Sequence, residues 1–200
     1  MATEFYLDYR SPYAYLANSQ VKNFPGAVSF KPLDIVAVMR VVNNQPSPLC
    51  PPKARYAGID AGRWAEQYGV PFRPNRALLG GFSTGKIDGT LLSRASLAAQ
   101  EFGLFDQINR ALFDAVWASD ADLLSEDGRN AFLKANDILA PNLWSRAGSP
   151  DIVARLDALN QEAAERGVFG VPTFFVGSEM FFGNDRLAFV EAALEREMAA

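Results

Sequence analysis

The chain has 200 residues, a formal net charge of −4 at pH 7, one cysteine and no histidine. The acidic balance argues against nucleic acid or an anionic membrane as the main partner, because both attract clustered Lys and Arg. Without histidine, Ser-His-Asp and Cys-His hydrolases and His-ligated zinc sites are excluded, and a lone Cys50 excludes an internal disulfide and a Cys-x-x-Cys pair. The sequence has no apolar stretch of the ~20 residues that span a bilayer and no secretory signal pattern, so we expect a cytoplasmic protein without a membrane partner.

The first forty residues predict a β-α-β unit. Residues 3–9 are rich in aromatic residues, as is typical of a strand. Ser11 and Pro12 suit the start of a helix that should run to about residue 23. Residues 27–34 predict a second strand, in which Pro32 indicates a sheet edge or the strand end. The helix is long enough for a right-handed crossover between parallel strands.

The middle of the chain predicts helices only. Residues 43–53 carry four prolines and cannot form regular structure. Helical spacing then recurs in four segments: 55–69, 90–103, 105–119 and 125–137. The glycine-rich residues 75–90 between them are interpreted as a mobile lid or a long loop. Asp60 lies at helical spacing and is expected on a solvated helix face.

The last third returns to strands. A helix is expected from Ser149-Pro150 to Gly167. A strand at 171–177, a turn at Ser178-Glu179 and a partner strand at 180–182 predict a hairpin, followed by a closing helix. The order indicates an α/β fold, with a sheet domain of residues 1–42 and 150–200 interrupted by an all-helical insertion of residues 43–149.

Four separated motifs together resemble a known family. They are Ser11-Pro12-Tyr13 after the first strand, Asn44 with Lys53 nine residues later, Gly170-Val171-Pro172-Thr173, and Gly183-Asn184-Asp185-Arg186. The chain resembles the thioredoxin-fold family that includes 2-hydroxychromene-2-carboxylate isomerase and the kappa-class glutathione transferases. The resemblance covers nearly the whole chain and implies a thioredoxin-like domain, a homodimer and glutathione as the cofactor.

Ser11 is the candidate catalytic residue. In thioredoxin-like oxidoreductases the first helix begins at the attacking cysteine of a Cys-Pro-x-Cys motif, and here the matching residues are Ser11, Pro12, Tyr13 and Ala14. Both sulfur positions are lost, but the N–H donors and partial positive charge of the helix N-terminus remain and stabilise an anion. The resemblance implies that Ser11 donates a hydrogen bond to a glutathione thiolate. Considered alone, the Ser-Pro pair favours a plain helix cap, because capping is so common, and only the other motifs shift the balance towards a functional role.

The resemblance assigns roles to further residues, each of which also has an ordinary structural interpretation. Pro172 is expected in a cis peptide that frees the backbone of Val171 for the cofactor, although a proline can simply begin a strand. The cofactor's γ-glutamyl end is expected at Asn184 and Asp185, which could instead cap the last helix. The remaining candidates are Asn44 and Lys53 for the glycyl carboxylate or an acidic substrate, and Tyr13 for the substrate pocket.

The implied reaction is the glutathione-dependent interconversion of 2-hydroxychromene-2-carboxylate and trans-o-hydroxybenzylidenepyruvate, a step of naphthalene-type catabolism. A borrowed thiolate would explain how a chain without histidine can carry out nucleophilic catalysis. Two alternatives stay open at this point. One is a glutathione transferase that conjugates electrophiles, and the other is a non-catalytic thioredoxin-fold binding protein that has lost its cysteines.

Overall fold

The computed structural model describes residues 3–199, without the side chain of Pro48. The described residues form two compact units, one from residues 3–70 with 159–199 and the other from 71–158. The division into domains at residues 43 and 149, expected from the sequence, stays a prediction.

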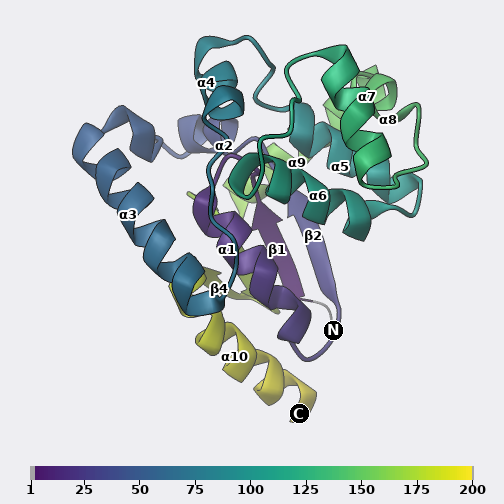
Figure 1. The fold of residues 1–200 in the computed structure, drawn as a ribbon. Coiled ribbons are helices and arrows are strands. Elements are labelled where there is room, and N and C mark those ends of the chain that lie inside the picture. The colour runs from purple at the N-terminus through teal and green to yellow at the C-terminus, as the bar shows by residue number, and fades with distance from the viewer. Residues whose placement is uncertain (1–2, 200) are drawn as a thin grey trace. The chain divides into compact units, whose positions relative to one another are not determined.

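The first unit is built on a four-stranded sheet in the order β2-β1-β3-β4 (Figure 1). β1 pairs in parallel with β2, whereas β1–β3 and β3–β4 are antiparallel. The α/β thioredoxin-like arrangement predicted from the sequence is therefore confirmed, and Pro32 ends an edge strand, as expected. The elements of this unit are β1 (Thr3–Leu7), α1 (Pro12–Gln20), η1 (Val21–Asn23), β2 (Val28–Pro32), α2 (Ile35–Val41), η2 (Ser47–Leu49), α3 (Pro51–Tyr68), the end of α9 (Pro150–Glu165), β3 (Thr173–Val176), β4 (Glu179–Phe182), η3 (Asn184–Arg186) and α10 (Leu187–Ala199).

The two faces of β1 pack differently because successive side chains in a strand point to opposite sides. Phe5 stacks on Phe174 of β3 with ring centroids 4.6 Å apart, and Phe24, just after η1, lies 5.8 Å from Phe174. On the other face, the hydroxyl of Tyr6 donates to Glu162 of α9 at 3.2 Å. The α1–η1 segment thus covers an aromatic core, and α9 is tied to the opposite face by polar contacts.

The second unit is helical throughout its described elements. They are α4 (Arg76–Thr84), α5 (Leu91–Glu101), α6 (Phe105–Trp117), α7 (Glu126–Ala135), α8 (Leu143–Ala147) and the start of α9. Leu97, Ile108 and Phe113 are fully buried, as the apolar spacing of these segments predicts.

The interpretation of residues 75–90 as a lid or long loop is wrong for residues 76–84, which form α4. Asn75 caps this helix by accepting a hydrogen bond from the amide of Leu78 at 3.1 Å, and Gly85 ends it with a φ of 71°. A Cβ at Gly81, in the middle of the helix, would meet the end of the Leu124 side chain, so a larger residue there would displace Leu124. The glycine of α4 therefore permits close packing and does not mark a flexible loop.

Three further differences concern the first unit. Residues 43–53, expected without regular structure, contain η2 and the first turn of α3, which begins at Pro51 because a proline is tolerated at the start of a helix, where its missing amide costs no hydrogen bond. The helix α2 was not predicted; it begins where Asp34 accepts a hydrogen bond from the amide of Val36 at 3.2 Å. The hairpin turn lies one residue earlier than expected, at Gly177-Ser178, and β4 already begins at Glu179. Gly177 has a φ of 57°, a conformation that glycine adopts without the clash that a Cβ would cause.

Gly69 ends α3 in the left-handed conformation, with a φ of 65° and its amide bonded to the carbonyls of Ala65 and Glu66. We expect Gly69→Ala to lower the free energy of unfolding by about 1–2 kcal/mol, because a Cβ is unfavourable in this region. Urea unfolding followed by circular dichroism measures the change. Gly62→Ala in the interior of α3 is the matched control. It meets nothing within 4 Å and should raise stability by up to about 1 kcal/mol. An unchanged midpoint in Gly69→Ala would contradict the argument.

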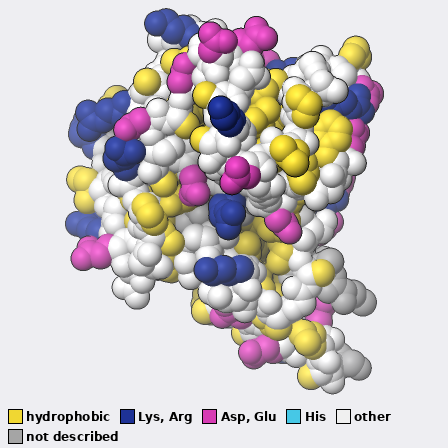
Figure 2. All heavy atoms as spheres, turned by 45° about the vertical axis from the view of Figure 1, so that its right-hand side comes forward, with side chains coloured by type: hydrophobic (Ala, Val, Ile, Leu, Met, Phe, Trp, Pro, Cys, Tyr) yellow, Lys and Arg dark blue, Asp and Glu magenta, His cyan; other side chains and the backbone are white. Residues whose placement is uncertain are grey.

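Among the described residues, no helix combines the length and the apolar character needed to cross a membrane. On the face of the molecule that Figure 2 shows, basic and acidic side chains are interspersed.

Candidate functional site

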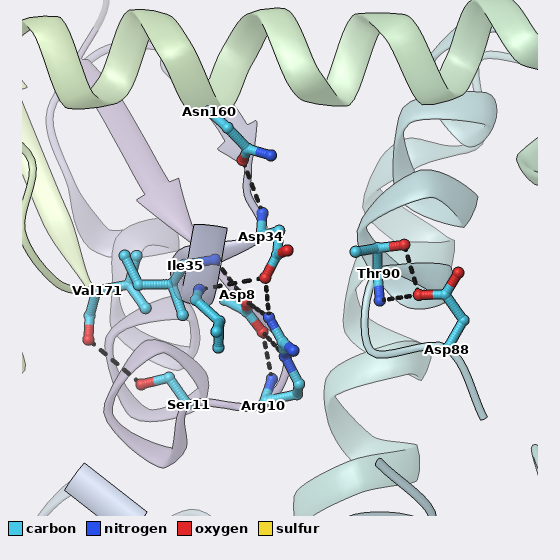
Figure 3. Close-up of polar contacts among 10 residues, drawn as sticks. Asp8, Arg10, Ser11, Asp34, Ile35, Asp88, Thr90, Asn160 and Val171 are labelled. Atoms are coloured by element: carbon cyan, nitrogen blue, oxygen red, sulfur yellow. Dashed lines mark hydrogen bonds and ion pairs between the residues drawn. The ribbon is translucent and has the colours of Figure 1, made fainter. Parts of the chain in front are cut away.

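Ser11 lies at the N-terminus of α1, immediately after the turn that follows β1. Its Oγ accepts a hydrogen bond from the amide of Ala14 at 3.2 Å, which is the geometry of a helix cap. The same hydroxyl donates to the carbonyl of Val171 at 3.3 Å (Figure 3). A serine hydroxyl has one proton, and a 3.3 Å bond is long for an O–H donor. The proton of Ser11 can therefore turn to a better acceptor while the cap is kept.

The Val171-Pro172 peptide is cis, as the resemblance implies. It lies beside Ser11 through the Val171 carbonyl, and the Pro172 carbonyl accepts the amide of Gly183 at 2.9 Å. This places the segment before β3 between the start of α1 and the start of η3. Val171 and Pro172 are both buried.

Asn184 and Asp185 form η3, a short turn in front of α10, rather than the first turn of the closing helix itself. Asn184 is only 4% exposed, and its side-chain amide nitrogen, Nδ2, is buried without a hydrogen-bond partner. Its backbone carbonyl accepts the hydroxyl of Tyr68, at the end of α3, at 2.8 Å. Asp185 is 45% exposed and pairs with Arg186 at 2.6 Å. A buried donor without a partner is costly in a folded protein, so Nδ2 of Asn184 requires an acceptor, which a water molecule or a ligand atom can supply.

Asn44 bonds the segment that leads to Val171, whereas no hydrogen bond or ion pair joins Lys53 to this segment among the described residues. The Asn44 side chain donates to the carbonyl of Phe169 at 2.8 Å, two residues before Val171, and accepts the amide of Gln45 at 2.8 Å. Lys53 is exposed in the first turn of α3. Cys50 is free and partly exposed just before that helix.

Tyr13 faces α3, where its partner is Asp60, a residue that was expected on a solvated helix face. Its hydroxyl donates to Asp60 at 2.9 Å, and Tyr56 donates to the other Asp60 oxygen at 3.2 Å. Burial, followed by the hydrogen bond to Asp60, raises the pKa of Tyr13 above its ordinary value. Asp60 was expected on a solvated face because its spacing with Arg63 and Glu66 is helical. The sequence carries no signal that Asp60 lies opposite Tyr13, because this position depends on how α1 packs on α3.

The structure thus brings all of the eight candidate residues except Lys53 to one end of the sheet: Ser11, Tyr13, Asn44, Val171, Pro172, Asn184 and Asp185. This end offers a hydroxyl and amides at a helix start, a buried free amide donor and an exposed carboxylate. Such a set can bind a zwitterionic peptide and hold an anion at the start of α1. Within residues 3–199, no cluster of three or more His, Cys, Asp or Glu side chains is arranged to hold a metal ion.

Comparison with known families decides the classification. The family model described as a DSBA-like thioredoxin domain matches residues 2–195. The chain belongs to this family. Among its DsbA-like relatives, the 2-hydroxychromene-2-carboxylate isomerase of Pseudomonas putida is 29% identical over 98% of this chain and 95% of its own length. Glutathione S-transferase kappa 1 of Caenorhabditis elegans is 22% identical over 96% of this chain and 90% of its own length.

Solved structures agree with this DsbA-like classification. The structure of a 2-hydroxychromene-2-carboxylate isomerase superposes with a TM-score of 0.80 and 25% identity, covering 99% of this chain and 96% of that one. A probable DsbA oxidoreductase from Streptomyces coelicolor gives a TM-score of 0.74 at 18% identity, covering 100% of this chain and 90% of that one, which shows the fold alone. The chain therefore has the DsbA-like fold without a Cys-x-x-Cys pair, since its single cysteine is Cys50.

Proposed function

We propose that the protein is a glutathione-dependent isomerase that interconverts 2-hydroxychromene-2-carboxylate and trans-o-hydroxybenzylidenepyruvate. The single observation that carries the proposal is Ser11, a hydroxyl donor at the N-terminus of α1 that touches Val171 of the cis peptide. This is the place of a redox cysteine in a thioredoxin-like fold, and with serine there the thiol must come from a ligand. The similarity to isomerases from pseudomonads supports the choice of substrate.

The residues present fit glutathione. The buried Nδ2 of Asn184 lacks an acceptor, and a γ-glutamyl carboxylate supplies one. Asp185 is exposed beside it and carries the charge that an ammonium group requires. We assign the cysteinyl part of the peptide ligand to the backbone of Val171, whose carbonyl lies 3.3 Å from the Ser11 hydroxyl.

The chain's own residues then have separate tasks. Ser11 and the amides that begin α1 hold a negative charge on sulfur. Lys53, an exposed cation, binds the substrate carboxylate, and Asn44 orients the loop before it by its bond to Phe169. When bound, glutathione would supply a nucleophilic thiolate for isomerisation about a conjugated double bond. Positioning of the two reactants contributes a large part of the reduction in barrier.

The test is an activity assay with 2-hydroxychromene-2-carboxylate, with and without glutathione. We expect isomerisation that requires glutathione and leaves its total concentration unchanged in the steady state. Consumption of glutathione would instead indicate a conjugating transferase. Absence of both glutathione binding by calorimetry and isomerisation would refute the proposal in favour of a non-catalytic binding protein.

Tyr68 should contribute to glutathione affinity through the turn that it holds. Its hydroxyl bonds the Asn184 carbonyl at 2.8 Å, so Tyr68→Phe frees η3 without removing a residue that faces the ligand. We expect the Kd for glutathione to rise about two- to tenfold, the range of one neutral hydrogen bond. Calorimetry measures it. Tyr6→Phe is the control, because it removes a hydroxyl bonded to Glu162 and should leave the Kd unchanged. Equal affinities for Tyr68→Phe and the wild type would contradict this role.

A further inference from the structure

A buried charge cluster lies directly before Ser11 in the chain and has no role in the proposed function as stated above. Asp8 follows β1 and is 1% exposed. Its carboxylate accepts hydrogen bonds from the backbone amide of Arg10 at 2.9 Å, from the Arg10 guanidinium at 2.6 and 3.0 Å, and from the amide of Ile35 at 3.0 Å. The Asp8 carboxylate thus fixes both the turn before α1 and the first amide of α2.

Arg10 connects Asp8 to a second carboxylate. Its guanidinium also bonds Asp34 at 2.6 Å, and Asp34 caps α2 while its own amide donates to Asn160 of α9 at 2.9 Å (Figure 3). Burial alone would lower the pKa of Arg10, but the ion pairs with Asp8 and Asp34 raise it above its ordinary value. Arg10 is therefore a permanent cation held from two sides, and its planar fork matches both partners in a way that a lysine cannot.

The cluster controls the residue that follows it. The amide of Ser11 donates to the Asp8 carbonyl at 3.0 Å, so residues 8–11 form a closed turn whose third residue is Arg10. Because both the backbone and the side chain of Arg10 are bonded to Asp8, the peptide that leads into Ser11 has little freedom. Two carboxylates with one cation leave a single net negative charge near the start of α1, where an anion is to be stabilised. Without Arg10 that charge would double and would oppose the anion.

We infer that Arg10 is a positioning residue for thiolate formation at Ser11, fixing the turn that delivers the serine hydroxyl and neutralising one of two carboxylates next to it. The inference rests on the proposed function, since it concerns the same thiol. Arg10 is not proposed to contact glutathione. It acts through Ser11 and through the charge of the cluster.

The test is the titration of the glutathione thiol bound to the full-length protein, followed by the ultraviolet absorbance of the thiolate. We expect Arg10→Gln to raise the midpoint pH and to lower kcat/KM about three- to tenfold, less than complete removal of the Ser11 hydrogen bond to the thiolate, because the bond is misplaced and not lost. Arg10→Lys, which keeps the charge but lacks the fork, should lie between Arg10→Gln and the wild type. S-methylglutathione has no thiol to ionise. Its Kd should stay within about twofold of the wild-type value in both variants, because neither substitution removes a contact to the ligand.

Arg166→Gln is the matched control. Arg166 is also a partly buried arginine of this unit and pairs with Glu4 and the hydroxyl of Tyr6, but on the α9 face of the sheet. The Arg166→Gln substitution should lower the free energy of unfolding and leave the thiol titration unchanged.

The outcomes separate this inference from the proposed function. If Ser11→Ala shifts the titration and Arg10→Gln does not, the inference is overturned and the proposed function stands. If Arg10→Gln fails to fold because Asp8 is left without its cation, a wild-type titration in Arg10→Lys overturns the inference instead. A wild-type protein that binds no glutathione overturns the proposed function, and the inference with it.

Discussion

Replacing Ser11 by alanine should raise the pH at which bound glutathione ionises by about one to two units. The physical reason is the loss of one hydrogen bond to a charged acceptor, worth about 1.5–3 kcal/mol, since 1.36 kcal/mol corresponds to one pKa unit. A donor to the thiolate favours the ionised form, so its removal raises the pKa of the thiol. At neutral pH the smaller thiolate fraction should lower kcat/KM about 10- to 100-fold by the same arithmetic.

The measurement is the absorbance of the bound thiolate against pH, with kcat/KM measured in parallel. Ser11 is also the cap of α1, so its loss should cost about 1 kcal/mol of stability whatever the function. Ser125→Ala controls for this, because Ser125 caps α7 through the amide of Gly128 at 2.9 Å and lies in the helical unit. If both variants lose stability and neither shifts the titration, Ser11 is a helix cap only.

The strands of the sheet could be predicted from local patterns, whereas helix α2 could not, because a contact distant in the sequence helps to form it. The aromatic-rich composition of residues 3–9 predicted β1, and the turn of the β3–β4 hairpin was predicted to within one residue of its position at Gly177-Ser178. Helix α2 was missed because Ile35–Val41 is rich in β-branched residues, which favour strands. It forms because Asp34 and Asp8 bond its first amides, and Asp8 is 27 residues away in the sequence. Such a tertiary contact has no signal in the local pattern.

The candidate site was predictable as a set of residues but not as a set of bonds. Motif order placed Ser11, Pro172 and Asn184 in one hypothesis, and the structure brings them to one end of the sheet. The sequence could not reveal that Asn44 would bond a backbone carbonyl or that Asp60 would receive two tyrosine hydroxyls. These contacts depend on the packing of loops and of α3, which apolar periodicity does not specify.

Asp185→Asn should weaken glutathione binding about 10- to 100-fold while leaving the fold unaffected. A carboxylate that pairs with the ammonium of the γ-glutamyl group contributes a charged hydrogen bond of about 1.5–3 kcal/mol, and asparagine keeps the shape but removes the charge. The Asp185–Arg186 pair is about half exposed on both sides, at 45% and 48%, and exposed pairs contribute at most about 1 kcal/mol to stability. Affinity and stability should therefore change independently.

Calorimetry with glutathione gives the affinity, and thermal unfolding without ligand gives the stability. Glu179→Gln is the control: Glu179 is another exposed carboxylate of the same unit, paired with Arg196 at 3.2 Å on β4, and its removal should not alter the Kd. A ligand without the amino group provides a second test. If Asp185 recognises the ammonium group, the wild type and Asp185→Asn should bind deaminated glutathione with equal affinity. If Asp185→Asn instead weakens both ligands alike, the carboxylate holds η3 in place and the ammonium is bound elsewhere.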